Sequence, residues 1–291
     1  MDFKHFRSPY VFAGIEYMYK ESDAILVQVP YDSTTSYRGG TRDGPHAFIT
    51  ASRQLDMYDW ELGVEIATKI KVHTLNELEP SMDSPAETIS LVKECVSEIV
   101  RDEKLPIMVG GEHSLTPGAV AAVKEKYADV SVLQIDAHSD LRDEYEGSKN
   151  NHACAMRRTR EIVNTVVQVG IRSSCVDEIE YVKKNKLEKF IFGTEFKDED
   201  VLKQLGNSNN VYITVDLDGF DPSEIPGVGT PEPGGLHWPQ VIRLLRKVAE
   251  KKRIVGFDVM ELAPIAGSNQ SEFYAAKLAY KLLGYSFLLK R

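Results

Sequence analysis

Cysteines and long apolar runs are scarce in this sequence, and both absences narrow its class. The three cysteines, Cys95, Cys154 and Cys175, are an odd number and lie far apart, which excludes a small disulfide-stapled fold and is typical of a reducing compartment. The longest apolar runs, such as Ala24–Val29, suit strands and are too short to cross a bilayer. Residues 1–20 contain no continuous apolar segment of the kind found in signal peptides. We therefore expect a cytoplasmic protein without a membrane partner.

Positive charge is also in short supply. The 291 residues carry a formal net charge of -9 and contain no basic stripe, which argues against a nucleic-acid partner. The sequence has no Gly/Ser/Pro-rich linker, internal repeat or low-complexity segment. We therefore expect a single domain that spans residues 1–291, and the 42% hydrophobic content is ample for its core.

What the sequence does contain is an alternation of short apolar runs with longer amphipathic stretches. The runs are apolar throughout, as expected for strands that are covered on both faces. The predicted strands are Ala24–Val29, Pro106–Val109, Val130–Ile135, Thr165–Val169, Phe190–Phe192, Val211–Val215 and Ile254–Val259. The predicted helices are Ser84–Arg101, Gly118–Tyr127, Val176–Lys186, Trp238–Lys251 and Glu272–Leu289. This alternation predicts a three-layer α/β/α sandwich with a mostly parallel central sheet.

Polar groups directly follow four of the predicted strands. In open parallel sheets, ligands bind in the crevice beyond the carboxyl ends of the strands, so these segments are the first place to look for a site. The segments are Gly110-Gly111-Glu112-His113-Ser114, Asp136-Ala137-His138-Ser139-Asp140, Asp216-Leu217-Asp218-Gly219-Phe220-Asp221-Pro222 and Met260-Glu261-Leu262-Ala263-Pro264. Taken singly, each is weak, because an Asp-x-His is more often a loop-capping acid beside a surface histidine.

Taken together, these segments predict a metal centre. The candidate ligands are His113, Asp136, His138, Asp140, Asp216 and Asp218. Several carboxylates packed together would repel one another or shift their pKa values upward, and a pair of divalent cations removes that conflict. A set of carboxylates and imidazoles without cysteine suits Mn²⁺ better than thiophilic metals. We therefore expect two Mn²⁺ ions.

At these residues the chain resembles the ureohydrolase family, which includes arginase and agmatinase. The first three of the segments above match family motifs, although the family more often has Asp where Glu112 stands. Two further segments, Gly227–Leu236 and the agmatinase-like Gly40–Pro45, extend the resemblance along nearly the whole chain. The resemblance implies the arginase/deacetylase-like form of the α/β/α fold. It also implies hydrolysis of a guanidino C–N bond with release of urea.

The resemblance further implies a division of the ligands between two ions. One ion would be held by His113, Asp136, Asp140 and Asp216, and the other by Asp136, His138, Asp216 and Asp218. Water activated by the ions would attack the guanidinium carbon, and Asp140 would orient it. His152, in Asn150-Asn151-His152-Ala153, would handle the proton that the departing amine requires. Glu261 would grip the guanidinium through paired hydrogen bonds. His46, His73 and His237 match no motif and are assigned structural roles.

The choice of guanidine substrate depends on the loop between the second motif and His152. Asp143 and Glu144 make this loop acidic, which favours a substrate with a cationic tail, although a solvated acidic loop explains the charges equally well. These two residues, Asn150 and Glu261 are the candidate substrate-binding residues. Arg142 complicates the prediction, since it could pair locally or contact a carboxylate. Agmatine, which would yield putrescine and urea for polyamine biosynthesis, therefore ranks first.

Several alternatives stay open at this point. Aminopropylagmatine, hydrolysed to spermidine, shares the guanidine end and lengthens the cationic tail, whereas arginine and guanidinobutyrate rank lower and formiminoglutamate lowest. A metal-binding regulatory homologue would have lost a ligand or His152, and neither is lost. A deacetylase of related fold would use one Zn²⁺ and fewer carboxylates. Because relatives commonly form trimers or hexamers, we also expect a homo-oligomer.

Overall fold

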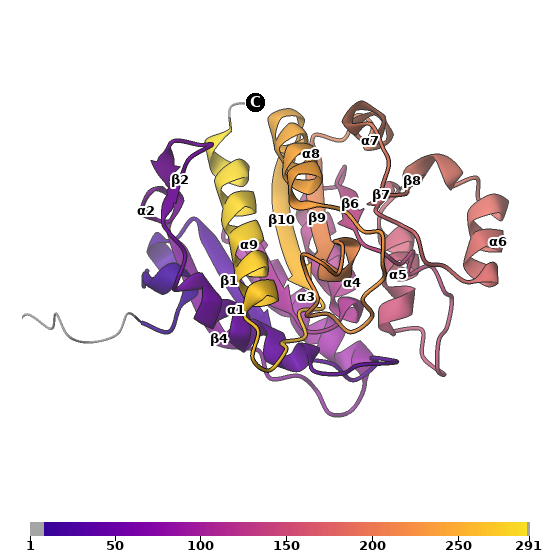
Figure 1. Cartoon of the computed structure of the whole chain (residues 1–291), viewed down its shortest axis with the longest axis horizontal. Helices are drawn as coiled ribbons and strands as arrows, with labels where there is room; N and C mark the ends of the chain where they lie inside the picture. Colours follow the sequence, from indigo (N-terminus) through magenta and orange to yellow (C-terminus); the bar gives the residue numbers. More distant parts are fainter. Residues whose placement is uncertain (1–8, 290–291) are drawn as a thin grey trace, which may run out of the picture.

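The central sheet of the molecule contains eight strands, and every neighbouring pair is parallel (Figure 1). The computed structural model describes residues 9–289. The strands lie in the order β4-β1-β5-β10-β9-β6-β7-β8. Their bounds are β1 Ala24–Val29, β4 Val72–Glu77, β5 Leu105–Gly110, β6 Ser131–Ile135, β7 Val166–Val169, β8 Ile191–Phe192, β9 Asn210–Asp216 and β10 Arg253–Met260. A separate antiparallel ribbon pairs β2 (Tyr58–Asp59) with β3 (Val64–Glu65).

Helices cover both faces of the sheet, so the predicted three-layer α/β/α sandwich is confirmed (Figure 1). On one face lie α1 (Gly44–Ser52), α2 (Ile66–Lys69), α7 (Asp198–Gln204), α8 (Trp238–Lys251) and α9 (Gln270–Leu288). On the other face lie α3 (Pro85–Arg101), α4 (Thr116–Lys126), α5 (Ala155–Ile162) and α6 (Val176–Lys184). A parallel sheet needs this cover because both of its faces are apolar.

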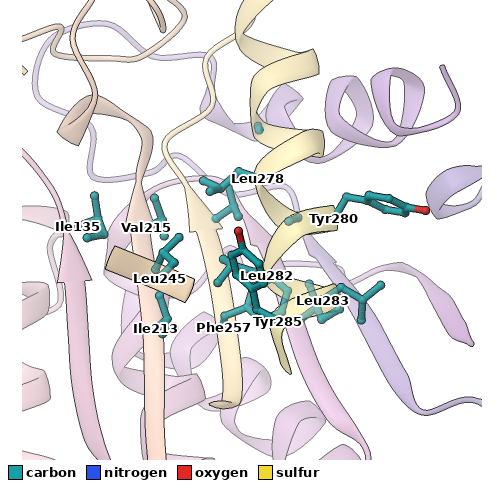
Figure 2. Close-up of a cluster of buried hydrophobic side chains, with 14 of the residues drawn as sticks. Ile135, Ile213, Val215, Leu245, Phe257, Leu278, Tyr280, Leu282, Leu283 and Tyr285 are labelled. Atoms are coloured by element: carbon teal, nitrogen blue, oxygen red, sulfur yellow. The ribbon is translucent and has the colours of Figure 1, made fainter. Parts of the chain in front are cut away.

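Alternate side chains of the central strands enter two separate cores. On β9, Ile213 and Val215 pack under α8 and α9, whereas Tyr212 enters the opposite core. Figure 2 shows the first core, where Phe257 of β10 lies among leucines of α8 and α9. Fully burying a side chain of this size stabilises the fold by roughly 1.5–3 kcal/mol. This packing holds β9 and β10 rigidly, and both strands lead into the candidate site.

The N-terminus of α3 forms as its sequence predicts. Ser84 has extended backbone angles, and its side chain accepts a hydrogen bond of 3.3 Å from the backbone N–H of Glu87. Pro85 occupies the first helical position, where its missing N–H costs nothing. The cap fixes the start of a helix whose buried face includes Val92 and Val96.

Several elements were absent from the sequence prediction. The edge strand β4 is half exposed and mixes polar with apolar residues, so it has no continuous apolar signature. The sequence also does not predict the helices α1, α5 and α7, which have nine, eight and seven residues, because so few turns show little helical periodicity. Among residues 9–289, no helix has the length and apolarity needed to cross a membrane. Cys95, Cys154 and Cys175 are all free thiols.

The strand order brings together loops that are far apart in the sequence. β5, β10, β9 and β6 are consecutive neighbours in the sheet, although β10 is the last strand of the chain. Because all four strands are parallel, the loops at their carboxyl ends emerge at one edge. These are the four loops that carry the predicted site residues.

Candidate metal centre

Close backbone packing positions the loops that carry the candidate ligands. A Cβ atom on Gly111 would lie 1.6 Å from the carbonyl oxygen of Tyr31, so only glycine fits there. Gly219 similarly packs against the backbone of Asp136, whose N would lie 2.8 Å from an added Cβ. These contacts hold the loops after β5 and β9 against the rest of the sheet edge, and they place His113 and Asp218 beside the end of β6.

The first ligand group surrounds His113. Its Nδ1 lies 3.1 Å from Oδ2 of Asp136, 3.3 Å from Oδ2 of Asp140 and 3.3 Å from Oδ2 of Asp216. All four side chains are buried. The side chains of His113, Asp136 and Asp140 come close enough to offer one ligand atom each to a single ion.

The second ligand group shares Asp136 with the first. Nδ1 of His138 lies 2.9 Å from Oδ2 of Asp218 and 3.8 Å from Oδ1 of Asp136. Thus Asp136 turns one oxygen toward each histidine, as a residue that bridges two ions would. Asp216 belongs to the first group and also contacts the second, because its Oδ1 accepts a hydrogen bond of 2.9 Å from the backbone N–H of Asp218. The structure therefore brings all six predicted ligands together.

The electrostatics of this cluster call for additional positive charge. Burial, together with the neighbouring carboxylates of Asp140 and Asp218, raises the pKa of Asp136 well above its usual value. Burial and nearby carboxylates raise the pKa of Asp216 in the same way. Burial would by itself lower the pKa of His138, but the adjacent carboxylates of Asp218 and Asp136 raise it to about 11. Divalent cations would remove this repulsion.

The unpaired nitrogen of His113 supports the fit of a metal. Nδ1 is buried and makes no hydrogen bond with any described residue, even though three carboxylate oxygens lie around it. A buried polar atom without a partner is costly, and a ligated cation gives it one. The donor set contains oxygens and imidazole nitrogens but no thiolate, which suits a hard or borderline divalent ion. The residues present therefore fit a metal pair.

A network of hydrogen bonds orients the ligands from behind. Nε2 of His113 lies 2.8 Å from Oγ1 of Thr214 on β9. The hydroxyl of Thr116 lies 3.4 Å from that of Thr214 and donates to Asp258, which also accepts from the hydroxyl of Tyr212. The N–H of His138 donates to Oδ1 of Asp136 at 2.6 Å. Such partners fix the tautomer and the direction of a ligating side chain.

Two candidate site residues adopt left-handed backbone conformations. Asp140 has φ 51° and Glu261 has φ 65°, a region that non-glycine residues rarely occupy. The surroundings hold both in place, since the carbonyl of Asp140 accepts from the N–H of Arg157 and the N–H of Glu261 donates to the carbonyl of Gly111. Strained residues of this kind cluster at functional sites, which agrees with the roles predicted for them.

Glu261 lies beside the ligands at the end of β10. Its Oε1 accepts a hydrogen bond of 2.7 Å from the N–H of His113, and its side chain is buried. Burial and the carboxylates of Asp216 and Glu112 raise its pKa well above the usual value. A cationic group would favour the ionised form of such a carboxylate.

Two adjoining cavities open over the cluster. A cavity of about 30 Å³ is lined by His113, Asp216, Asp218 and Glu261, with Thr35 to Arg38 of the loop after β1 at its side. A second cavity of about 270 Å³ continues outward and is lined by Arg142, Tyr145 and Glu178. Five residues line both cavities, namely Ser36, His138, Asp140, His152 and Thr230. His152 is therefore placed between the carboxylate cluster and the outer space.

The acidic loop does not contribute its charges to either cavity. Asp143 is exposed and accepts a hydrogen bond of 2.6 Å from Arg158, with Lys149 and Arg157 nearby. Glu144 is also exposed, and neither it nor Asn150 is among the lining residues. The structure thus separates these three predicted substrate-binding residues from the cluster.

Arg142 lies with its guanidinium 4.3 Å from the ring centre of Tyr145 and lines the outer cavity. His46, His73 and His237 lie away from both cavities. A separate hollow of about 400 Å³, lined by Asp23, Lys104 and Arg253, lies at the amino ends of the strands, opposite the edge at which parallel sheets bind ligands.

The sequence prediction missed two parts of the site. Thr230 donates a hydrogen bond of 3.2 Å to Oδ2 of Asp218, and the loop after β1 supplies Thr35, Ser36, Tyr37 and Arg38. The strand-end rule would have identified this loop, because it follows the predicted strand Ala24–Val29 directly. The sequence does not single out its residues, because three of the four carry hydroxyl groups, and these are weak signals of metal chemistry.

A parallel α/β/α sandwich with two carboxylate–imidazole groups at its carboxyl edge has the fold and the donor set of a metal-binding protein. Residues 22–284 match the model of the arginase family, and the chain belongs to that family. This confirms the resemblance stated from the motifs. Members of the family depend on a binuclear metal site, and the two groups around Asp136 correspond to such a site.

Individual relatives match over nearly the whole chain. The N(1)-aminopropylagmatine ureohydrolase of Synechocystis sp. is 39% identical over 277 residues, which cover 92% of this chain and 90% of that protein. The agmatinase of Pyrococcus horikoshii is 34% identical over 272 residues, which cover 92% and 93%. The crystal structure of the agmatine ureohydrolase of Thermoplasma volcanium superposes with a TM-score of 0.80 at 34% identity and covers 94% of this chain and 92% of that one.

Proposed function

We propose that this protein hydrolyses a guanidino C–N bond and releases urea, with agmatine as substrate and putrescine as the second product. The observation that carries the proposal is the pair of carboxylate–imidazole groups that share Asp136 at the base of a cavity. Support also comes from the names of the relatives, which are agmatinases and aminopropylagmatine ureohydrolases. The role belongs to polyamine biosynthesis.

The proposed cofactor is a pair of Mn²⁺ ions. His113, Asp136, Asp140 and Asp216 would hold one ion, and Asp136, His138, Asp216 and Asp218 the other. When bound, the ions would supply a nucleophile near neutral pH by lowering the pKa of water. The absence of thiolate from the donor set favours Mn²⁺ over thiophilic metals.

The residues of the chain bind the substrate and move its protons. Oε1 of Glu261 is taken by the N–H of His113, so Oε2 is the oxygen left to bind a guanidinium N–H. Asp140, which lines both cavities, would orient the attacking water through its carboxylate. An alkylamine leaves only after it has gained a proton, and the imidazole of His152 would deliver that proton.

The outer cavity supports a substrate with an extended tail. With the guanidinium at Glu261, the tail would pass His152 into the space lined by Arg142, Tyr145 and Glu178. Because Asp143 is paired with Arg158 and exposed, we assign Asp143, Glu144 and Asn150 no direct contact with substrate within one chain. Their remaining contribution would be long-range attraction of a cation.

Aminopropylagmatine is the second candidate substrate. Two observations favour it, namely the 39% identity with the Synechocystis enzyme of that name and the volume of the outer cavity, about 270 Å³, which His152 lines. Its guanidine end would bind in the same way, and only the contacts of its tail would differ.

We also propose that the protein is a homo-oligomer and lies in the cytoplasm. The three free thiols are in keeping with a reducing compartment.

A comparison of substrates tests this assignment. The kcat/KM of the Mn²⁺-loaded protein should be highest for agmatine or aminopropylagmatine and lower for arginine and guanidinobutyrate, because a carboxylate on the tail would approach the carboxylate of Glu178. A preference for a carboxylate-bearing substrate would instead assign its carboxylate to Arg142, which lines the same cavity. A preference for arginine would overturn the substrate, while leaving the urea-releasing reaction intact.

A further inference from the structure

Glu112 is a buried carboxylate that the proposed metal centre does not use. It is fully buried, and both of its oxygens are already engaged by neighbours. Oε2 accepts a hydrogen bond of 2.6 Å from the N–H of Thr34, and Oε1 accepts hydrogen bonds of 2.5 Å from the hydroxyls of Thr34 and Ser114. Three donors hold this carboxylate in one orientation. A buried carboxyl group bound this firmly calls for an explanation beyond packing.

Thr34 connects Glu112 to the candidate proton donor. Its Oγ1 accepts a hydrogen bond of 3.0 Å from the backbone N–H of His152 and lies 3.4 Å from Nδ1 of the same residue. Its carbonyl oxygen lies 3.5 Å from Nδ2 of Asn151. Thr34 and Asn151 are buried. Thr34 thus joins the loop after β1 to the segment that carries His152, although the two residues are 118 positions apart in the sequence.

The proton count of these groups determines which nitrogen of His152 carries hydrogen. A threonine hydroxyl has one proton to donate, and the short bond to Oε1 of Glu112 takes it. Toward His152, Oγ1 therefore presents a lone pair. Nδ1 can approach that lone pair favourably only when it carries the proton, which leaves Nε2 as the nitrogen that can exchange a proton with substrate.

We propose that Glu112 and Thr34 act as a positioning pair that fixes the orientation and the tautomer of His152. The inference rests on the role of His152 in the proposed function. Thr34 touches the imidazole and Glu112 acts through Thr34, so neither is itself the proton donor. The edge-on ring of Tyr145, with its centre 6.2 Å from that of His152, limits the other directions in which the imidazole can turn.

The length of Glu112 is essential to this arrangement. An aspartate there would withdraw the carboxylate by about one C–C bond, roughly 1.5 Å. The contacts to Thr34 of 2.6 and 2.5 Å would then exceed the length at which a hydrogen bond forms. The glutamate at position 112 is therefore matched in length to the threonine at position 34.

Substitutions at Thr34 test the proposal in the Mn²⁺-loaded protein. Thr34→Val keeps the shape of the side chain and removes the hydroxyl, whereas Thr34→Ser keeps the hydroxyl. We expect Thr34→Val to lower kcat for agmatine by about 10-fold or more, which is part of the roughly 100- to 10,000-fold that a general acid contributes, with KM changed less than about 3-fold. Thr34→Ser should stay within about 3-fold of the original kcat. Metal content should be unchanged in both. Thr34→Val should lower Tm, because it leaves the buried carboxylate of Glu112 with one hydrogen bond fewer, so kcat is compared at a temperature at which both variants are folded.

Thr159→Val is the matched control, because Thr159 is also buried but donates only to the carbonyl of Ala155 within α5. It should leave kcat unchanged. Equal losses in Thr34→Val and Thr34→Ser, or an unchanged kcat in Thr34→Val, would overturn the positioning role. Should Thr34→Val fail to fold, Glu112→Asp provides the same test, since it should lower kcat at normal metal content. Absence of urea release from the unmodified protein would instead overturn the proposed function.

Discussion

The backbone N–H of His113 donates a 2.7 Å hydrogen bond to Oε1 of Glu261. This bond ties the first candidate ligand, at the end of β5, to the candidate guanidinium carboxylate at the end of β10. The bond occupies Oε1, and Glu261 lines the inner cavity, so Oε2 is the oxygen proposed to bind substrate. In the proposed function, this hydrogen bond would fix the guanidinium-binding carboxylate relative to the metal ligands.

Glu261→Gln should weaken substrate binding without emptying the metal centre. The amide can still accept from His113, but it cannot hold the guanidinium with a full charge. Hydrogen bonds to charged groups contribute about 1.5–3 kcal/mol, so kcat/KM for agmatine should fall by roughly 10- to 150-fold. Steady-state kinetics and elemental analysis on the same sample measure both effects. An unchanged kcat/KM would remove Glu261 from substrate binding.

Asp136→Asn should disrupt both ligand groups, because Asp136 faces His113 with Oδ2 and His138 with Oδ1. We expect fewer than two Mn²⁺ ions per chain by elemental analysis after dialysis, and loss of urea release. Asp129→Asn is the control, since Asp129 lies at the surface and bonds only the segment around Asn210. Two tightly held ions in the Asp136 variant would contradict the bridging role.

Thr214→Val should weaken metal binding, because the hydroxyl of Thr214 contacts Nε2 of the ligand His113. With a metal at Nδ1 of His113, Nε2 must carry the proton and donate it to Thr214 at 2.8 Å. Loss of such a partner typically lowers metal affinity by about 10- to 100-fold. Calorimetric titration of the metal-free protein with Mn²⁺ measures the change, and Thr214→Ser should bind within about 3-fold of the original affinity. Identical affinities for the two variants would contradict the orienting role.

The ion-pair cluster around Lys281 predicts how stability depends on acid. Burial alone would raise the pKa of Glu61, but hydrogen bonds from Lys281, Tyr285 and Arg246 lower it below 4.5. A carboxyl group whose pKa is lower in the folded than in the unfolded protein stabilises the fold at pH values above its pKa in the unfolded chain. This stability is lost as the pH falls through the pKa of the folded state. The free energy of unfolding of the original protein should therefore fall more steeply below about pH 4.5 than that of Glu61→Gln. Denaturant titrations between pH 3 and 6 measure this free energy for both proteins. The same pH dependence in both would contradict the assignment.

The sequence predicts the ligands well because each follows a buried strand. Runs such as Val211–Val215 are apolar on both faces, which identifies them as interior strands, and parallel strands collect their carboxyl ends at one edge. The position of Asp216 beside Asp136 follows from that geometry. The placement of β10 between β5 and β9 does not follow, because local pattern carries no information about which strands become neighbours.

The substrate loop shows the limit of reading charge from sequence. Asp143 was predicted to bind substrate because the loop is acidic, but its partner Arg158 lies 15 residues on, in α5, a helix that the prediction had not identified. Conversely, the sequence assigns no role to Glu112. Its contact with Thr34 spans 78 residues and is visible only in three dimensions.

Urea release from agmatine with and without Mn²⁺ tests the central claim most directly. The metal-free protein, prepared by exhaustive chelation, should release no urea, and addition of Mn²⁺ should restore urea and putrescine in equal amounts. Full activity after chelation would contradict a mechanism built on the ligand groups around Asp136. Absence of urea from every guanidine substrate in the presence of Mn²⁺ would contradict the proposed reaction itself.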